Sequence, residues 1–132
     1  MKKILVTGGC GFIGSNFIRN QLLKTNNIIL NIDKLTYSSN KDNIKTIDNL
    51  SNYSFLEADI ADVNLIRSTF RKFAPSCIIN FAAETHVDRS IDSPDSFIDT
   101  NIIGTLNLLK ASLEYFMTNK KFKFVHVSTD EV

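Results

Sequence analysis

A cluster of glycines between an apolar run and a helical segment limits most strongly how this chain can fold. Four glycines lie between residues 8 and 14, directly after Ile4-Leu5-Val6 and at the start of a segment with helical apolar spacing, residues 12–24. Glycine is needed where a strand turns sharply into a helix, where backbone must approach a ligand closely, and where a helix packs tightly on a sheet. The N-terminus of such a helix faces the phosphates of a bound dinucleotide. The order therefore predicts the first βαβ unit of a dinucleotide-binding sheet.

The spacing of the glycines leaves the type of loop open. Gly11 and Gly14 combine with Gly8 in one register and with Gly9 in another, which is GxGxxG. Asp33 adds an independent signal, since it ends the second apolar run roughly 20 residues beyond the cluster, where an acidic side chain accepts the ribose hydroxyls. The combination predicts a dinucleotide site.

The residues after the second apolar run bear on the choice of cofactor. A carboxylate at Asp33 would repel a 2′-phosphate, which favours NAD, whereas the neighbouring Lys34 keeps NADP open. The sequence has no GxxxxGK[ST] pattern, which argues against a P-loop ATPase or kinase.

Apolar runs alternate with helical segments along the whole chain. The expected strands are residues 4–6, 28–32, 54–57, 77–81 and 122–127, and the expected helices are residues 12–24, 63–73 and 94–117. Runs this apolar are typical of strands buried on both faces. We therefore predict an α/β fold, a Rossmann-type doubly wound parallel sheet of order 3-2-1-4-5.

Some details of the predicted fold depend on single residues. Residues 38–52 are interpreted as a loop with a weak helix, and His126 as a hydrogen-bonded core residue. Helical spacing places Phe97, Leu106, Leu109 and Leu113 in the core. The phenylalanines in expected strands and helices, including Phe12, Phe17, Phe70 and Phe122, are also expected to pack in the core.

Composition excludes several classes of function. The 132 residues suit one domain, and the 15 basic and 14 acidic residues are interspersed, which argues against a nucleic-acid partner. No stretch approaches the roughly 20 apolar residues of a membrane span. Cys10 and Cys77 are far apart and outside any metal-binding pattern, so we expect no metal site and a cytoplasmic location.

The last expected strand leads into a hydroxyl and two adjacent carboxylates, Thr129, Asp130 and Glu131. Ligands of open α/β sheets bind at the carboxyl ends of the strands. Two close carboxylates resist ionising together, so one can act as an acid and the other as a base. These residues are our candidates for catalysis.

The motifs together resemble the extended short-chain dehydrogenases/reductases that act on nucleotide sugars, and within them the dTDP-glucose 4,6-dehydratases. The matching segments are residues 7–15, 33–37, 59–60, 81–90, 100–105 and 128–132. The two carboxylates are the most specific match, because epimerases and decarboxylases of the group usually carry Ser, Ala or Thr there. Thr85 departs from the usual Ser but retains the hydroxyl.

The resemblance implies a site for NAD and a sugar nucleotide. It assigns NAD to Gly8, Gly11, Phe12, Ile13, Gly14, Asp33, Lys34, Leu35, Thr36, Asp59, Ile60, Phe81, Ala82, Ala83, Glu84, Thr85 and Thr100. It assigns substrate contacts to Thr85 and Thr129, proton removal at C5 to Glu131, and protonation of the departing C6 hydroxyl to Asp130. The implied reaction is conversion of dTDP-glucose or UDP-glucose to the 4-keto-6-deoxy sugar nucleotide and water.

The same family continues beyond the matched region, with a Tyr-x-x-x-Lys pair and a substrate domain. We therefore expect residues 1–132 to be an incomplete NAD-binding domain without its substrate domain, inactive alone and homodimeric when full length. The alternatives are a sugar-nucleotide 4-epimerase or decarboxylase of the same family, or a noncatalytic NAD-binding module.

Overall fold

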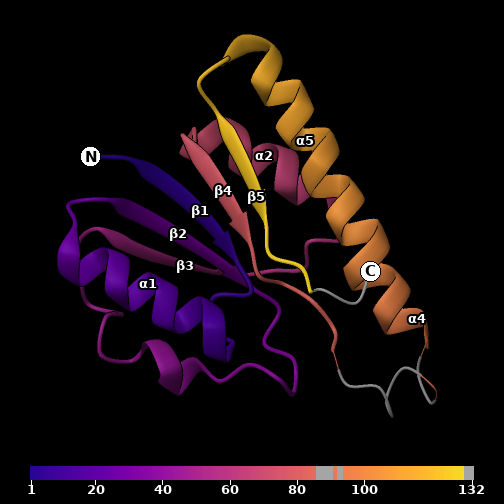
Figure 1. Ribbon diagram of the computed structural model, residues 1–132, viewed down its shortest axis with the longest axis horizontal. Coiled ribbons are helices and arrows are strands. Elements are labelled where there is room, and N and C mark those ends of the chain that lie inside the picture. The colour runs from indigo at the N-terminus through magenta and orange to yellow at the C-terminus, as the bar shows by residue number, and fades with distance from the viewer. Residues whose placement is uncertain (86–90, 92–93, 130–132) are drawn as a thin grey trace.

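A five-stranded parallel sheet forms the centre of the molecule (Figure 1). The computed structural model describes residues 1–85, 91 and 94–129. The strands are β1 (Lys3–Thr7), β2 (Ile28–Asp33), β3 (Tyr53–Glu57), β4 (Cys77–Asn80) and β5 (Lys123–His126). They pair in parallel in the order β3-β2-β1-β4-β5, which confirms the predicted Rossmann-type sheet.

The helices follow the expected positions with one exception. They are α1 (Phe12–Lys24), η1 (Lys41–Ile44), α2 (Val63–Phe73), α4 (Pro94–Phe97), η2 (Ile98–Gly104) and α5 (Thr105–Thr118). The bounds of α1 and α2 agree with the prediction, and η1 is the weak helix expected in residues 38–52. The single helix expected over residues 94–117 is instead interrupted by η2, a π-helical segment.

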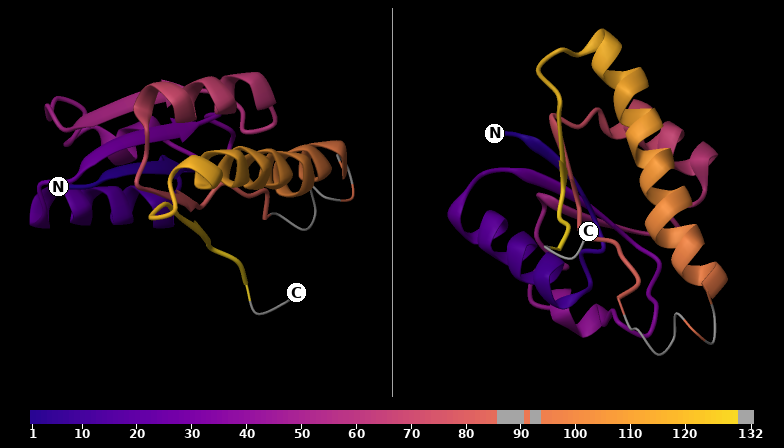
Figure 2. Two further views of the ribbon diagram at one scale, coloured as in Figure 1. Left: turned by 90° about the horizontal axis from the view of Figure 1, so that it is seen from above. Right: turned by 45° about the vertical axis from the view of Figure 1, so that its right-hand side comes forward.

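Helices lie on opposite faces of the sheet (Figure 2), and an apolar cluster lies under each layer of helices. Ile4 and Val6 of β1 face α1, whose Ile18 is fully buried among them. Successive strand residues point to opposite faces, so Leu5 belongs to the other core with Phe70 of α2. Full burial of one such side chain stabilises the fold by about 1.5–3 kcal/mol.

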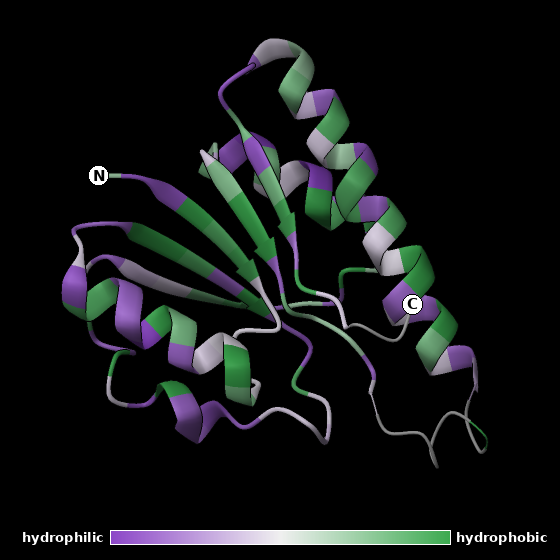
Figure 3. Ribbon diagram, viewed as in Figure 1, coloured by the Kyte–Doolittle hydropathy of each residue, from purple (hydrophilic) through white to green (hydrophobic). Residues whose placement is uncertain are grey.

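The face that α5 turns to the sheet differs from the predicted one. Leu106, Leu109 and Leu113 are 41%, 47% and 63% exposed, so their assignment to the core is wrong. Leu108 and Ala111 are buried instead. With 3.6 residues per turn, Leu106, Leu109 and Leu113 lie on one side of α5 and Leu108 and Ala111 on the other, so apolar spacing alone does not identify the buried side. Figure 3 shows apolar residues repeated along α5 as well as along the strands.

The phenylalanines do not all pack inside. Phe70 and Phe122 are buried and contact each other with ring centroids 5.8 Å apart. Phe12, however, is 82% exposed, because it is the first residue of α1 and lies beyond the sheet's carboxyl edge. Its assignment to the core is therefore wrong.

Candidate functional site

The glycine loop joins β1 to α1 at the carboxyl edge of the sheet. Gly8 has a φ of 71°, and a Cβ there would lie within 2.7 Å of backbone atoms of Phe81 and Ala82. A Cβ on Gly14 would overlap the carbonyl oxygen of Gly8. Around Gly11, by contrast, only one atom lies within ordinary contact distance of an added Cβ, at 3.4 Å. Gly8 and Gly14 are thus required by packing, and Gly11 leaves room beside the loop.

Of the two glycine registers, the structure favours Gly8, Gly11 and Gly14. Gly8 and Gly11 line a cleft, whereas Gly9 is not in its lining and a Cβ there would overlap the side chains of Asn31 and Ile18. Gly9 is therefore needed for packing under the loop and does not face the cleft.

The N-terminus of α1 supplies hydrogen-bond donors at this loop. Ser15 N donates to Gly11 O, which closes the first helical turn at 3.0 Å. The amides of Phe12, Ile13 and Gly14 precede that bond and have no acceptor within the helix. Such amides, together with the helix dipole, favour an anion.

A buried polar cluster supports the loop from below. Asn31 of β2 is fully buried, and its Oδ1 accepts from Gly9 N at 3.1 Å. Its Nδ2 donates to Tyr53 Oη at 3.0 Å and contacts Cys10 Sγ at 3.6 Å. Burial, and less strongly the charge of Asp33, raises the pKa of the Cys10 thiol from its ordinary 9.0 to about 12. Burial also raises the pKa of Tyr53.

Asp33 ends β2 and is 6% exposed. Its Oδ2 accepts from Cys10 N at 2.8 Å, and its Oδ1 accepts from Leu35 N at 2.9 Å. A carboxylate offers about four lone-pair sites, so both oxygens retain the capacity to accept a hydroxyl from the cleft. The two amides fix this carboxylate beside the glycine loop.

The residues after β4 form the opposite wall of the cleft. Glu84 is 8% exposed, and its Oε2 accepts from Tyr37 Oη at 2.9 Å. The backbone of Glu84 is held by Asn101 of η2 through two hydrogen bonds of 2.9 Å. Thr100, the preceding residue, also lines the cleft. The π segment therefore positions this wall, which accords with the frequent occurrence of such segments at functional sites.

The third wall follows β3. Asp59 Oδ1 accepts from Ala61 N at 2.9 Å, and Asn107 Nδ2 of α5 donates to Ala61 O at 2.8 Å. A Cβ on Gly104 would overlap Ile60, which shows how closely the helix approaches this loop. These contacts fix the loop at residues 59–61.

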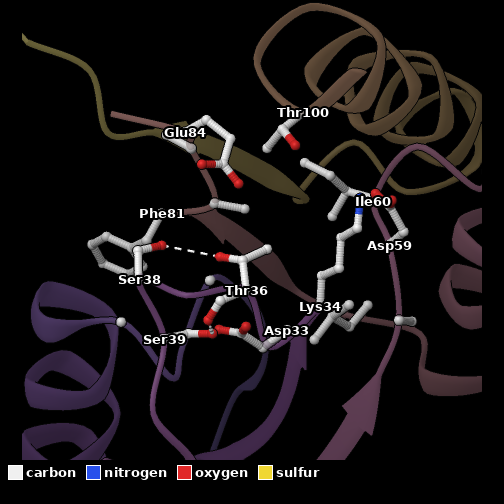
Figure 4. Close-up of a pocket in the computed structure, with 16 residues that line it drawn as sticks. Asp33, Lys34, Thr36, Ser38, Ser39, Asp59, Ile60, Phe81, Glu84 and Thr100 are labelled. Carbon is white, nitrogen blue, oxygen red and sulfur yellow. Dashed lines mark hydrogen bonds and ion pairs between the residues drawn. The ribbon is translucent and has the colours of Figure 1, made fainter. Parts of the chain in front are cut away.

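Together these segments line an open cleft at the carboxyl ends of four strands (Figure 4). Most of the cofactor residues predicted from the sequence line it: Gly8, Gly11, Asp33, Lys34, Thr36, Asp59, Ile60, Phe81, Ala82, Ala83, Glu84 and Thr100. The predicted residues outside the lining are Phe12, Ile13, Gly14, Leu35 and Thr85. Phe12, Ile13 and Gly14 lie at the start of α1, whereas the side chain of Leu35 packs against the core that includes Ile4 and Ile18.

Four lining residues escaped the sequence analysis: Ile32, Ser38, Ser39 and Ala58. Ser38 and Ser39 belong to the stretch that was interpreted as a loop with a weak helix, which begins two residues after the predicted residue Thr36. The positioning roles of Asn31 and Asn107 were also missed. Their signal is a polar residue at a buried position of a strand or helix, which marks a hydrogen bond.

A polar chain links the carboxyl ends of β1, β4 and β5. Asn80 Oδ1 accepts from Thr7 Oγ1, and Asn80 Nδ2 lies 3.0 Å from His126 Nδ1. His126 is thus hydrogen-bonded as predicted, but it is exposed, so its assignment to the core is wrong. It lies on β5, which is an edge strand of the described sheet.

The candidate catalytic residues follow this edge strand. Thr129 is exposed, and Thr85 follows the neighbouring strand β4 and is also exposed. Because β4 and β5 are parallel neighbours, both threonines lie beyond the same edge of the sheet. Asp130 and Glu131 lie outside the described residues.

Tyr37 and Lys41 have the same Tyr-x-x-x-Lys spacing as the pair that the family carries beyond the matched region. They do not share a helix, because η1 begins at Lys41. The ammonium of Lys41 lies 4.9 Å from the ring centre of Phe55, on the far strand β3. The hydroxyl of Tyr37 donates to Glu84 Oε2 across the cleft.

The described residues contain neither a metal-binding cluster nor a helix that could span a membrane. Within residues 1–85, 91 and 94–129, no cluster of three or more histidine, cysteine, aspartate or glutamate side chains is arranged to hold a metal ion. None of the helices described there is long and apolar enough to cross a membrane. Cys10 and Cys77 are both free thiols.

Comparison with known proteins identifies relatives along the whole chain. The sequence profile of the GDP-mannose 4,6 dehydratase family matches residues 5–132. A dTDP-glucose 4,6-dehydratase of Haemophilus influenzae is 44% identical over 137 aligned residues, which include 100% of this chain and 40% of that protein. A probable dTDP-glucose 4,6-dehydratase of Sinorhizobium fredii is 48% identical, covering 98% of this chain and 38% of that protein. The chain thus spans about 40% of the length of these curated relatives.

Solved structures share the fold. The dTDP-glucose 4,6-dehydratase of Bacillus anthracis in complex with NAD superposes with a TM-score of 0.83 at 42% identity, covering 100% of this chain and 39% of that one. The UDP-glucose 4-epimerase of Thermotoga maritima with UDP-glucose gives 0.81 at 33% identity, covering 96% and 38%.

Proposed function

This chain belongs to the GDP-mannose 4,6 dehydratase family, and we propose that residues 1–132 form the NAD-binding domain of a nucleotide-diphosphate-glucose 4,6-dehydratase. The relatives at 44% and 48% identity bear the name dTDP-glucose 4,6-dehydratase, and one such enzyme was solved with NAD. The proposed substrate is dTDP-glucose or UDP-glucose, and the proposed products are the 4-keto-6-deoxy sugar nucleotide and water.

One observation supports the cofactor most directly. The open side of Gly11, the unbonded amides that begin α1 and the fixed carboxylate of Asp33 all lie at one carboxyl edge of the sheet. The amides suit a pyrophosphate, and the carboxylate suits the two hydroxyls of a ribose. The residues present therefore fit NAD. When bound, NAD supplies a reversible hydride acceptor for the sugar.

The proposed roles of the remaining residues concern proton transfer. Oxidation at C4 makes the C5 proton acidic, so Glu131 is proposed to remove it as the base. Asp130 is proposed to protonate the departing C6 hydroxyl, and general acid or base catalysis is worth roughly 10²- to 10⁴-fold for each group. Thr129 and Thr85, beyond the adjacent strands β5 and β4, are proposed to hydrogen-bond the sugar.

A second candidate is a sugar-nucleotide 4-epimerase of the same fold. It is supported by the structural similarity to the Thermotoga maritima epimerase, at a TM-score of 0.81. Both candidates use the same cleft, so the identity of the sugar product separates them. A 4-keto-6-deoxy product from the active protein supports the dehydratase assignment, whereas formation of the C4 epimer would support the epimerase assignment instead.

The state of the whole protein is also a proposal. We propose a homodimer in the cytoplasm. The exposed apolar residues Leu106, Leu109 and Leu113 of α5 support an apolar contact with a second copy. Two free cysteines suit a reducing compartment.

Binding of the cofactor tests the proposal most simply. Isothermal titration calorimetry with NAD and with NADP should show tighter binding of NAD. Asp33→Ala should weaken NAD binding by about tenfold or more, because charge-assisted hydrogen bonds are worth roughly 1.5–3 kcal/mol. Asp48→Ala, which removes an exposed carboxylate outside the cleft lining, is the matched control. Equal affinity for both cofactors would contradict the assignment.

A further inference from the structure

An ion pair joins two strand ends at one side of the cleft. Lys34 follows β2, and its Nζ lies 2.5 Å from Oδ2 of Asp59, which follows β3. Figure 4 shows the lysine side chain extended away from Asp33 along the cleft wall to meet Asp59. Both members of the pair line the cleft, with side chains 48% and 31% exposed.

The two partners differ in how firmly they are held. Asp59 is anchored, because its Oδ1 accepts from Ala61 N and the carbonyl of Ala61 is held by Asn107. Lys34 carries its ammonium on a flexible four-carbon stem. The position of the ammonium is therefore set by Asp59.

The position of this ammonium affects the choice of cofactor. A lysine directly after the ribose-binding carboxylate is well placed to bind a 2′-phosphate, since ammonium groups bind phosphates as point charges. In the ion pair that charge is neutralised, and the ammonium is directed away from Asp33.

We propose that Asp59 is a cofactor-specificity residue, which withholds the Lys34 ammonium from the 2′-phosphate of NADP. Selection of NAD then depends on two carboxylates, with Asp33 acting directly on the ribose and Asp59 acting through Lys34. This inference rests on the proposed function and identifies a determinant of cofactor choice at the same site.

The test is the ratio of the dissociation constants for NADP and NAD, measured by calorimetry on the purified protein. Asp59→Asn retains an oxygen for Ala61 N but loses the charge that holds Lys34. The ratio should fall by about tenfold in this variant, the scale of one charge-assisted hydrogen bond at a half-exposed site. A ratio is used because it cancels any loss of affinity common to both cofactors. Asp59→Ser, which also offers an oxygen to the amide, is the second variant if Asp59→Asn unfolds.

The matched control is the same change without the lysine. In the double variant Asp59→Asn with Lys34→Ala, the ratio should return to that of Lys34→Ala alone. If the fall in the ratio persists without Lys34, the charge of Asp59 itself repels NADP and the inference is overturned. An unchanged ratio in Asp59→Asn would also overturn it. Failure of the parent protein to bind either cofactor would instead contradict the proposed function, and the inference with it.

Discussion

The side chain of Asn101 pairs with both backbone hydrogen-bonding groups of Glu84. Glu84 N donates to Asn101 Oδ1, and Asn101 Nδ2 donates to Glu84 O, each at 2.9 Å. The asparagine lies in the π segment η2 and the glutamate follows β4, so the two hydrogen bonds join this helix to the loop at the wall of the cleft. An amide side chain is suited to this pairing because it has both a donor and an acceptor.

We expect Asn101→Ala to loosen this wall. The change leaves the amide and carbonyl of Glu84 without their partners. It should therefore lower the free energy of unfolding by about 2 kcal/mol and weaken NAD binding. Thermal unfolding and calorimetry measure the two effects. Asn64→Ala on α2, where the side chain is exposed, is the control. If the Asn101→Ala variant unfolds and binds NAD like the parent protein, the two hydrogen bonds contribute little to stability or to binding.

Gly8 and Gly11 should respond differently to the same substitution. Gly8→Ala places a Cβ against backbone at a φ of 71°, so we expect it to destabilise the fold by about 2 kcal/mol or more. Gly11→Ala has room and an ordinary φ of −72°, so the free energy of unfolding should change by less than about 1 kcal/mol.

In contrast to stability, NAD affinity should be sensitive to the Gly11→Ala substitution. Its added methyl group lies beside the cleft where a phosphate would approach, so NAD should bind the stable Gly11→Ala variant at least about tenfold more weakly. Denaturant titration followed by calorimetry separates the two properties. Parent-like NAD affinity in Gly11→Ala would argue against a phosphate at this position.

Much of the fold could be predicted because it depends on local pattern. The apolar runs and the glycine cluster are contiguous in sequence, and the handedness of parallel connections then restricts the strand order. Asp33 could be placed at the cleft for the same reason, since a strand end is a local feature. The bounds of α1 and α2 follow from helical apolar spacing, and in the structure Asp62 caps α2 by accepting from two backbone amides.

The remaining features depend on contacts between distant segments. The π turn of η2 arises where Gly104 packs on Ile60 and Asn101 reaches Glu84, and neither contact leaves a periodic signal in the sequence. The exposed face of α5 could not be predicted because apolar residues occur on both of its sides. The pairing of Lys34 with Asp59 likewise needed the adjacency of β2 and β3 before it could be recognised.

The buried thiol of Cys10 should make stability depend on pH in the alkaline range. Its pKa rises from 9.0 to about 12 on folding, so the folded state disfavours the thiolate. Below pH 9 the thiol is protonated in both states and this effect is absent, whereas between pH 9 and about 12 the unfolded chain loses the proton more readily and stability falls. Cys10→Ala should lessen the decline in the free energy of unfolding over this window. Tyr53, whose pKa is also raised, contributes to the decline that remains.

Thiol labelling gives a second measurement of the same burial. The thiolate is the reactive form, so Cys10 should resist iodoacetamide at pH 8 until the protein unfolds, whereas it should react at once in denaturant. Cys77→Ala serves as the background, because it removes the other thiol. Rapid labelling of Cys10 in the native protein would show that the glycine loop opens readily.

Asp130 and Glu131 should have separable effects in the active protein. If Glu131 removes the C5 proton, Glu131→Gln should suppress exchange of that proton with deuterated solvent by roughly 10²- to 10⁴-fold. If Asp130 protonates the leaving hydroxyl, Asp130→Asn should slow loss of water while oxidation at C4 remains visible as transient absorbance of the reduced cofactor. Asp95→Asn, a carboxylate-to-amide change at an exposed position of α4, controls for the loss of charge. Turnover of both variants at the parent rate would mean that the two carboxylates are structural, and the dehydratase assignment would then fail even if NAD binds as proposed.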